Sequence, residues 1–219
     1  EIDTLDERRI NHLKGQDQVI VPTKWAAEIL SQYNINSKVV PLGVSEEFTP
    51  VQQNINKCIF ATVGKWEVRK GHDILHKLFA RAFPKETDVE LWCFCENHPL
   101  EREELEKWKN NYRVELNNRV KLFPRQDSIL EYLQMTTCGI FISRAEGWNL
   151  GCLEMMALGK QVIATNYSGH TEYCNSSNAY LIDITEKEPA YDGKWFHGFG
   201  NWAKLGNQQQ DQIIESLRD

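Results

Sequence analysis

The chain has 219 residues, of which 41% are hydrophobic and 26% are charged, and it contains seven tryptophans. This length and composition suit one large globular core or two small ones and exclude an intrinsically disordered chain. The net charge of −6, without any short basic run, argues against a nucleic-acid partner. The longest apolar runs, such as CGIFIS, have the length of strands, so we expect no transmembrane segment. No signal peptide is visible, and because the chain begins at Glu1 and not at methionine, we expect a fragment or a processed form.

Short apolar runs alternate with stretches of helical spacing along most of the chain. The runs predicted to be strands are 18–22, 38–42, 57–64, 88–95, 119–123, 138–143, 161–165 and 179–183. The predicted helices between them are 74–82, 105–112, 129–133 and 150–158. The strands are apolar throughout, which is typical of a buried parallel sheet. This alternation predicts an α/β fold with a doubly wound, Rossmann-like parallel sheet.

The two ends of the chain depart from this pattern. Residues 1–16 are charged and helix-like, and we interpret them as a linker or an N-terminal helix. Residues 17–183 form the predicted Rossmann-like domain. Residues 184–219 begin with a segment rich in Gly, Asn, Gln and aromatic residues, which predicts an irregular crossing loop. A final helix is predicted over 207–217.

The six cysteines raise the question of disulfides or a zinc site. No two of them form a C-x-x-C pair, and no two histidines have zinc-finger spacing. Free cysteine is among the most frequently buried residue types, so we expect ordinary reduced thiols in the core. Reduced thiols favour a cytoplasmic location.

The first candidate site is the junction VGKWEVRKGHD, residues 63–73, which follows a predicted strand. In a doubly wound sheet, ligands bind beyond the carboxyl ends of the strands. Gly64 permits a tight turn there. Three cations, Lys65, Arg69 and Lys70, then precede a helix, which favours the binding of an anion such as phosphate. The alternative is a solvated basic loop, and neither G-x-G-x-x-G nor a Walker A motif is present.

The second candidate site is the junction SRAEGWNLGCLEMMALG, residues 143–159. We expect Asn149 to cap the helix and Gly159 to end it. One apolar arc then gathers Leu150, Leu153, Ala157 and Leu158. Glu154 falls inside this arc. Burying a carboxylate there is costly unless it lies at the solvent-filled mouth of a cleft or binds a ligand. The alternative is a favourable charge near the positive helix end. Both Glu146, on the loop, and Glu154 can accept hydrogen bonds from sugar hydroxyls.

Together these junctions resemble the donor-binding half of retaining GT-B glycosyltransferases, the large group 1 family related to sucrose synthase. The segments that carry the resemblance are VGKWEVRKGHDIL and SRAEGWNLGCLEMMALGKQVIATNYSGHTEY. They are similar to the family's glycine turn, Lys-Gly pair and two glutamates separated by seven residues. The segments VIVPTKWAAEIL and VVPLGVSEEFTP are similar to the family's link into its C-terminal domain. The resemblance covers about residues 17–176 and implies the C-terminal half of a GT-B fold.

The resemblance also implies roles for individual residues. The implied nucleotide-sugar site consists of Gly64, Lys65, Lys70, Arg125, Glu146, Asn149, Leu150, Gly151 and Glu154. Lys65 and Lys70 would bind the donor diphosphate, and the amides that open the second helix would cradle phosphate or sugar oxygens. Glu146 would contact the hydroxyls of the donor sugar and Glu154 those of the ribose. The turn ending at Arg125 would lie beside the base. The catalytic residues would be Glu146 and Lys70.

The sequence departs from the family pattern at several positions. Lys65 stands where the family has arginine, which keeps the charge and loses the bidentate fork. Trp148, Asn149 and Gly151 stand where the family has Phe, Gly and Pro, so the identity of the sugar stays open. No Asp-x-Asp pair is present, so we expect the lysines and the helix start to hold the diphosphate without a metal ion. No cofactor is expected beyond the donor, a UDP-, GDP- or ADP-sugar.

GT-B enzymes of this kind have two Rossmann-like domains, of which the N-terminal one binds the acceptor. Because one such domain fits this chain, we expect the donor-binding half of a longer enzyme, inactive alone. Its acceptor would be a glycan, lipid or protein bound by the missing N-terminal domain, and peripheral membrane attachment stays open. The alternatives are a GT-B sugar epimerase or phosphorylase, the latter with a pyridoxal phosphate lysine, and a non-catalytic nucleotide-sugar-binding module.

Overall fold

The computed structural model describes residues 1–52, 57–95, 106–107, 110, 119–123 and 126–219. At its centre lies a six-stranded sheet with the strand order β5-β4-β3-β6-β7-β8. Its strands are β3 (Cys58–Val63), β4 (Val89–Phe94), β5 (Val120–Leu122), β6 (Cys138–Phe141), β7 (Gln161–Thr165) and β8 (Tyr180–Ile182). All five pairings between them are parallel. The prediction of an α/β fold with a doubly wound parallel sheet is confirmed.

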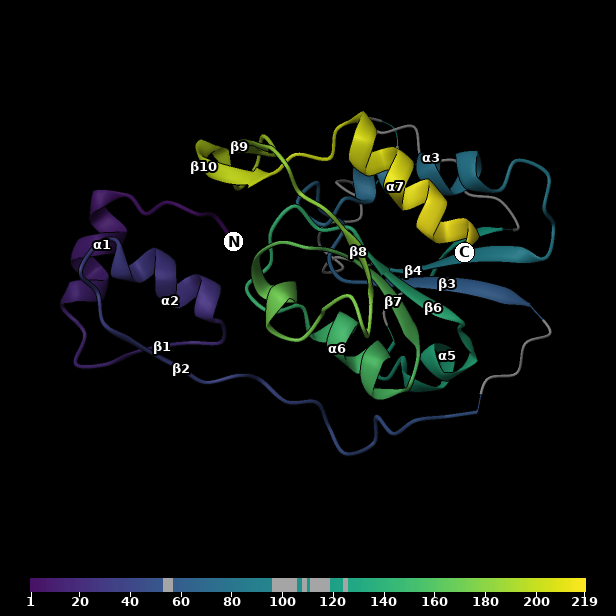
Figure 1. Ribbon diagram of the computed structural model, residues 1–219, viewed down its shortest axis with the longest axis horizontal. Helices are drawn as coiled ribbons and strands as arrows, with labels where there is room; N and C mark the ends of the chain where they lie inside the picture. The colour runs from purple at the N-terminus through teal and green to yellow at the C-terminus, as the bar shows by residue number, and fades with distance from the viewer. Residues whose placement is uncertain (53–56, 96–105, 108–109, 111–118, 124–125) are drawn as a thin grey trace.

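Helices cover both faces of this sheet (Figure 1). On one face lie α3 (His72–Ala82) and α7 (Asn207–Arg218), and on the other α5 (Leu130–Met135) and α6 (Leu150–Ala157). Because successive side chains of a strand point to opposite faces, β3 places Phe60 in the first core and Ile59 with Ala61 in the second. Both faces therefore bury apolar side chains, which explains the continuous hydrophobic runs. The predicted helix over 105–112 lies mostly outside the described residues.

The strand order reverses at the centre of the sheet. The chain builds β3, β4 and β5 outward in one direction and then returns to place β6 on the other side of β3. The helices that follow these two neighbours, α3 and α6, lie on opposite faces. In open α/β sheets, ligands bind beyond the carboxyl ends of the strands at such a reversal. Both predicted junctions, 63–73 and 143–159, follow directly from β3 and β6.

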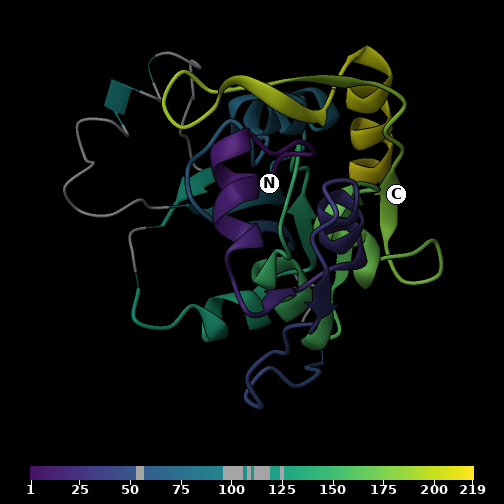
Figure 2. The ribbon, with the colours of Figure 1, turned by 90° about the vertical axis from the view of Figure 1, so that its left-hand side faces the viewer.

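Residues 1–39 form a small unit beside the central sheet (Figures 1 and 2). Its elements are α1 (Glu7–Lys14), β1 (Val19–Val21), α2 (Lys24–Ser31) and β2 (Ser37–Val39). β1 and β2 pair in parallel with each other and not with the central sheet. The strands predicted over 18–22 and 38–42 are therefore present, but they lie outside the central sheet. The sequence placed residues 17–183 in one domain, and these domain boundaries stay a prediction.

The segment before α7 differs from its prediction as an irregular loop. It holds an antiparallel hairpin of β9 (Lys187–Tyr191) and β10 (His197–Ala203). Gly198 and Gly200 have φ angles of 91° and 73°, and the pairing register shifts beside them. Such a bulge removes the alternation by which a strand is recognised in a sequence.

All six cysteines are free; five are buried and Cys58 is half-buried. The prediction of unpaired core thiols is confirmed. Within the part of the chain that the structure describes, no helix is long and apolar enough to cross a membrane.

Candidate functional site

The first junction turns at Gly64, where the chain leaves β3. Gly64 has a φ of 141°, which side-chain-bearing residues rarely adopt, and a Cβ there would lie 3.0 Å from Cε of Lys70. The absent side chain therefore leaves room for Lys70 to lie against the turn. Gly71 has a φ of 77°, and its Cβ would lie 2.4 Å from the carbonyl oxygen of Ile142. This glycine thus permits the close approach of the two junctions.

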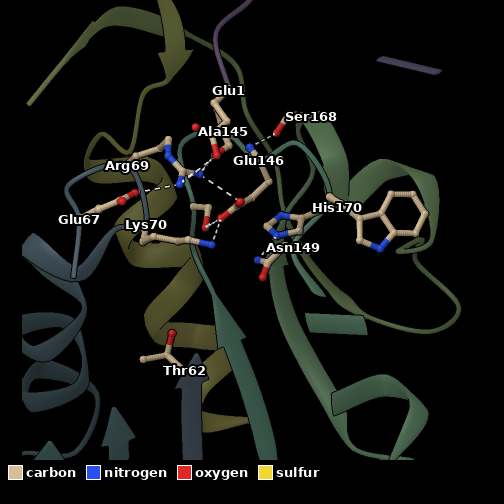
Figure 3. Close-up of polar contacts among 12 residues, drawn as sticks. Glu1, Thr62, Glu67, Arg69, Lys70, Ala145, Glu146, Asn149, Ser168 and His170 are labelled. Carbon is tan, nitrogen blue, oxygen red and sulfur yellow. Dashed lines mark hydrogen bonds and ion pairs between the residues drawn. The ribbon is translucent and has the colours of Figure 1, made fainter. Parts of the chain in front are cut away.

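Glu146, on the loop between β6 and α6, is the point where the junctions meet (Figure 3). Its side chain is 4% exposed and faces two cations of the first junction. Lys70 Nζ lies 2.7 Å from Oε1, and Arg69 Nη1 lies 3.0 Å from Oε2. Ser143 Oγ donates to Oε1 at 2.7 Å, and the Glu146 amide donates to Ser168 Oγ at 2.8 Å. These partners compensate the desolvation of the buried carboxylate.

The charge states of the buried groups follow from these contacts. Burial raises the pKa of Glu146, but Lys70 and Arg69 more than offset it, and the pKa falls to about 2. Burial lowers the pKa of His170 to about 4 and that of His72 to about 3. At neutral pH the site therefore holds an anionic glutamate between two cations, with uncharged histidines nearby.

Arg69 is enclosed and does not face open solvent. It is 6% exposed, and its Nη1 also donates to the carbonyl oxygen of Ala145 at 2.8 Å. Its Nη2 lies 2.8 Å from the carboxylate of Glu67 and 3.1 Å from that of Glu1. This differs from the expectation of three ligand-facing cations, because carboxylates already neutralise the guanidinium. Lys70, 13% exposed, and the exposed Lys65 are the less enclosed cations.

Asn149 ends the loop in a left-handed conformation, with φ 72° and ψ 75°. It occupies the N-cap position of α6, as predicted, but its side chain makes no capping hydrogen bond. Its Nδ2 instead lies 2.8 Å from Nε2 of His170, whose Nδ1 lies 3.1 Å from the carbonyl oxygen of Thr165. A proton on Nδ1 bonded to Thr165 leaves Nε2 to accept from the Asn149 amide. The His170 contact therefore holds a backbone conformation that glycine adopts more readily.

The start of α6 presents backbone amides at the carboxyl end of β3. The first N–H with a partner inside the helix is that of Leu153, which donates to the Asn149 carbonyl at 3.3 Å. The amides of Leu150 and Gly151 precede it and have no partner within the helix. A Cβ on Gly151 would lie 2.9 Å from Cβ of Val63, the last residue of β3. The positive end of α6 is thus placed where an anion is favoured.

Glu154 lies at a half-buried position of α6, and the predicted apolar arc around it is fully buried only at Leu158. The buried residues of the helix are Gly151, Cys152 and Met155. Leu150, a member of the predicted arc, is 44% exposed. The helix has this rotation because its first turn must bring Gly151 against β3. Glu154 itself is half-buried, and both burial and the charge of Glu47 raise its pKa. Its carboxylate has no hydrogen-bond or ion-pair partner among the described residues.

The structure brings the central residues of the predicted site together. Those placed around the ends of β3 and β6 are Gly64, Lys70, Glu146, Asn149, Leu150 and Gly151. Lys65 and Glu154 lie at more exposed positions, and Arg125 lies outside the described residues. Sequence reasoning missed Ser143 and Ser168 and gave His170 no role, because no spacing links them to the residues they contact.

The chain is similar to a known protein family and to several solved structures. Residues 57–191 match the family model of the glycosyl transferases group 1. No curated protein matches the chain. The HepE protein of Anabaena, solved with UDP-glucose, has a TM-score of 0.68 and 16% identity over 99% of this chain and 60% of its own. A sucrose-phosphate synthase from Thermosynechococcus elongatus has a TM-score of 0.67 and 20% identity over 98% of this chain and 58% of its own.

A glycosyltransferase from Rickettsia africae is a third structural relative, with a TM-score of 0.65 and 18% identity over 84% of this chain. The chain covers 54% of that protein, so it spans little more than half the length of these relatives. At such low identity the likeness shows the fold. The central sheet with its helices matches the Rossmann-like half of a GT-B glycosyltransferase.

Proposed function

Because the group 1 family model matches more than half of its residues, the chain belongs to the group 1 glycosyltransferases, and we propose that it binds the sugar donor of a retaining enzyme. The donor is a nucleotide diphosphate sugar, the class of molecule present in the Anabaena HepE structure. The observation that carries this proposal is the meeting of Lys70 with Glu146, 2.7 Å apart, at the reversal of strand order.

The diphosphate binds at the first junction and the start of α6. Lys70 and Lys65 supply positive charge, and the amides of Asn149, Leu150 and Gly151 supply hydrogen-bond donors at the positive helix end. No step of this binding requires a metal ion, since lysines and backbone donors stabilise the charge directly. The same groups stabilise the nucleotide diphosphate as it leaves, so they lower the barrier of transfer.

The sugar and the nucleoside are held by the two glutamates. Glu146 is ionised at neutral pH and accepts hydrogen bonds from hydroxyls of the donor sugar. Glu154, without a partner among the described residues, accepts from the ribose hydroxyls. Arg125 lies beside the base in this proposal, outside the described residues. Lys70 and Glu146 are the proposed catalytic residues, because they touch the leaving diphosphate and the transferred sugar.

Transfer with retention requires the acceptor to approach on the face from which the diphosphate leaves. The chain spans little more than half the length of its structural relatives. We therefore assign acceptor binding, of a glycan, lipid or protein, to a further domain. This donor-binding part binds nucleotide and does not transfer sugar alone.

The test is a thermal-shift screen of this chain with UDP, GDP, ADP and TDP, followed by calorimetry on each hit. A ligand at 100 times its dissociation constant stabilises the folded state by about 2.7 kcal/mol. One nucleotide should stand out, and the matching nucleoside without its diphosphate should bind far more weakly. A chain that none of the four nucleotides stabilises would contradict the proposal.

A further inference from the structure

Glu146 has more cationic partners than a single carboxylate charge requires. Lys70 contacts Oε1, Arg69 contacts Oε2, and Ser143 also donates to Oε1. A carboxylate has about four acceptor positions, two on each oxygen. Lys70 and Ser143 therefore occupy both acceptor positions of Oε1, and one acceptor position of Oε2 is open to a ligand hydroxyl. When Lys70 moves away, one acceptor position of Oε1 also becomes open.

The two cations differ in how firmly they are held. Lys70 is a single ammonium on a flexible stem, and it forms an ion pair with Glu146. Arg69 is fixed through both ends of its guanidinium, by Ala145 and Glu146 at Nη1 and by Glu67 at Nη2. A planar fork held in this way loses little further freedom on binding its carboxylate. Lys70 can therefore change partner, whereas Arg69 cannot.

We propose that Arg69 is a positioning residue of the donor site, which holds Glu146 through Nη1 while Lys70 exchanges Glu146 for a phosphate oxygen of the donor. Without Arg69, the movement of Lys70 would leave a buried carboxylate with Ser143 as its hydrogen-bond donor. Such a group would lose its charge or its orientation. The inference rests on the proposed function for the identity of the ligand, and on the geometry alone for the hold on Glu146.

Several ionisable groups face Glu146, and each bears on its titration. Lys70 and Arg69 come from the segment before α3, and His170 comes from the 3-10 helix η2 (Ser168–Glu172). His72, on α3, is also influenced by the charge of Glu146. Both histidines are uncharged at neutral pH, so Arg69 and Lys70 supply the positive charge around the carboxylate.

A matched control exists in the same loop. Arg144 is also a buried arginine, and it binds Asp73 through two hydrogen bonds of 2.8 and 2.9 Å. Its guanidinium binds Asp73, Glu188 and the Val68 carbonyl and does not contact the Glu146 side chain. Arg144→Gln therefore removes a buried arginine from this junction and leaves Arg69, Lys70 and Glu146 in place. Any effect that both arginine variants share is structural, and any effect confined to Arg69 reflects its hold on Glu146.

The first measurement needs no ligand. The side-chain carboxyl carbon of Glu146, assigned by its loss in Glu146→Gln, is followed by NMR from pH 7 to pH 4. In the wild-type protein and in Arg144→Gln it should not titrate over this range. In Arg69→Gln it should titrate with a midpoint above pH 4, and Arg69→Lys, which keeps a cation, should show a smaller rise. If Arg69→Gln does not fold, the rise in Arg69→Lys decides. A carboxyl that stays ionised to pH 4 in every folded Arg69 variant would overturn the proposal.

The second measurement isolates the sugar contact. Dissociation constants are compared for the nucleotide and its sugar derivative, UDP with UDP-glucose, GDP with GDP-mannose or ADP with ADP-glucose. Arg69→Gln should weaken the sugar derivative relative to the bare nucleotide by about fivefold, the loss of one hydrogen bond, and Arg144→Gln should not. An unchanged ratio in Arg69→Gln would contradict the role in sugar binding. A wild-type chain that binds none of these ligands would contradict the proposed function instead, and the titration of Glu146 would still decide the role of Arg69.

Discussion

The loop that carries Glu146 and the helix α6 that carries Glu154 belong to one short stretch, yet they provide opposite environments for a carboxylate. Glu146 is buried among two cations and a serine, and its pKa is lowered to about 2. Glu154 is half-buried with no partner among the described residues, and its pKa is raised. The loop thus compensates its carboxylate within the protein, whereas α6 leaves a carboxylate without such compensation, which in the proposed function a ligand provides. At neutral pH the first glutamate should matter to both folding and binding, and the second to binding alone.

The largest expected effect is a loss of unfolding free energy that occurs on replacing Glu146 and not on replacing Glu154. Glu146→Gln removes the negative charge between Arg69 and Lys70 and leaves Nη1 of Arg69 and Nζ of Lys70 without their carboxylate partner. Breaking a buried ion pair on one side costs about 3–5 kcal/mol. Glu154→Gln should change the free energy of unfolding by less than about 0.5 kcal/mol. Urea unfolding followed by tryptophan fluorescence measures both, and equal losses in the two variants would break the comparison.

The same two groups should give opposite pH dependences of stability. The pKa of Glu146 is lowered from 4.5 to about 2, so between these values the unfolded chain binds more protons. Its contribution, about 3 kcal/mol, is complete above pH 4.5 and is lost as the pH falls toward 2. The pKa of Glu154 is raised, so its contribution to stability falls as the pH rises through 4.5.

Unfolding free energies between pH 7 and pH 3 test this contrast. Glu146→Gln should flatten the loss of stability on acidification. Glu154→Gln should make that loss steeper, because it removes a group that favours folding at low pH. Variants with the same slope as the wild type would show that neither environment persists in solution.

Lys70 forms an ion pair with Glu146 and, in the proposed function, also binds the donor diphosphate. Lys70→Ala should weaken the binding of the nucleotide diphosphate by about 1.5–3 kcal/mol, the scale of a charge-assisted hydrogen bond. It should cost less stability than Glu146→Gln, because Arg69 and Ser143 remain on the carboxylate. Calorimetry measures the affinity, and the control is Lys77→Ala, at an exposed lysine on α3, the helix that follows Lys70. Equal affinity in the wild type and Lys70→Ala would remove Lys70 from the site.

The central sheet was predictable because its signal is local. Continuous apolar runs such as CGIFIS follow from burial on both faces of a parallel sheet, and strand–helix alternation fixes its class. The resemblance assigned both junctions to one site, whereas the adjacency of β3 and β6 is visible only in the structure. The hairpin before α7 was missed because Gly198 and Gly200 interrupt its alternation at a bulge.

The details of the site depend on contacts between distant segments, which spacing does not reveal. Asn149 matches the preference for a helix cap, but its amide is taken by His170, 21 positions later. The predicted apolar face of α6 differs from the face that is buried, because the approach of Gly151 to Val63 sets the rotation of the helix. Arg69 counted as a free cation in the sequence, and only the fold shows the carboxylates around it.

The smallest expected effect concerns Glu154 and the ribose. Glu154→Gln keeps the shape of the side chain and weakens its hydrogen bonds, so nucleotide affinity should fall by about 1 kcal/mol. This loss should occur with the ribonucleotide and be absent with its 2′,3′-dideoxy analogue, whichever base the site accepts. Glu47→Gln is the matched control, because Glu47 influences Glu154 through its charge and should leave the ribose preference intact. An equal loss for ribo- and dideoxynucleotides would show that the unpartnered charge on α6 has no diol to bind, and the contrast between the two glutamates would then describe folding and not ligand recognition.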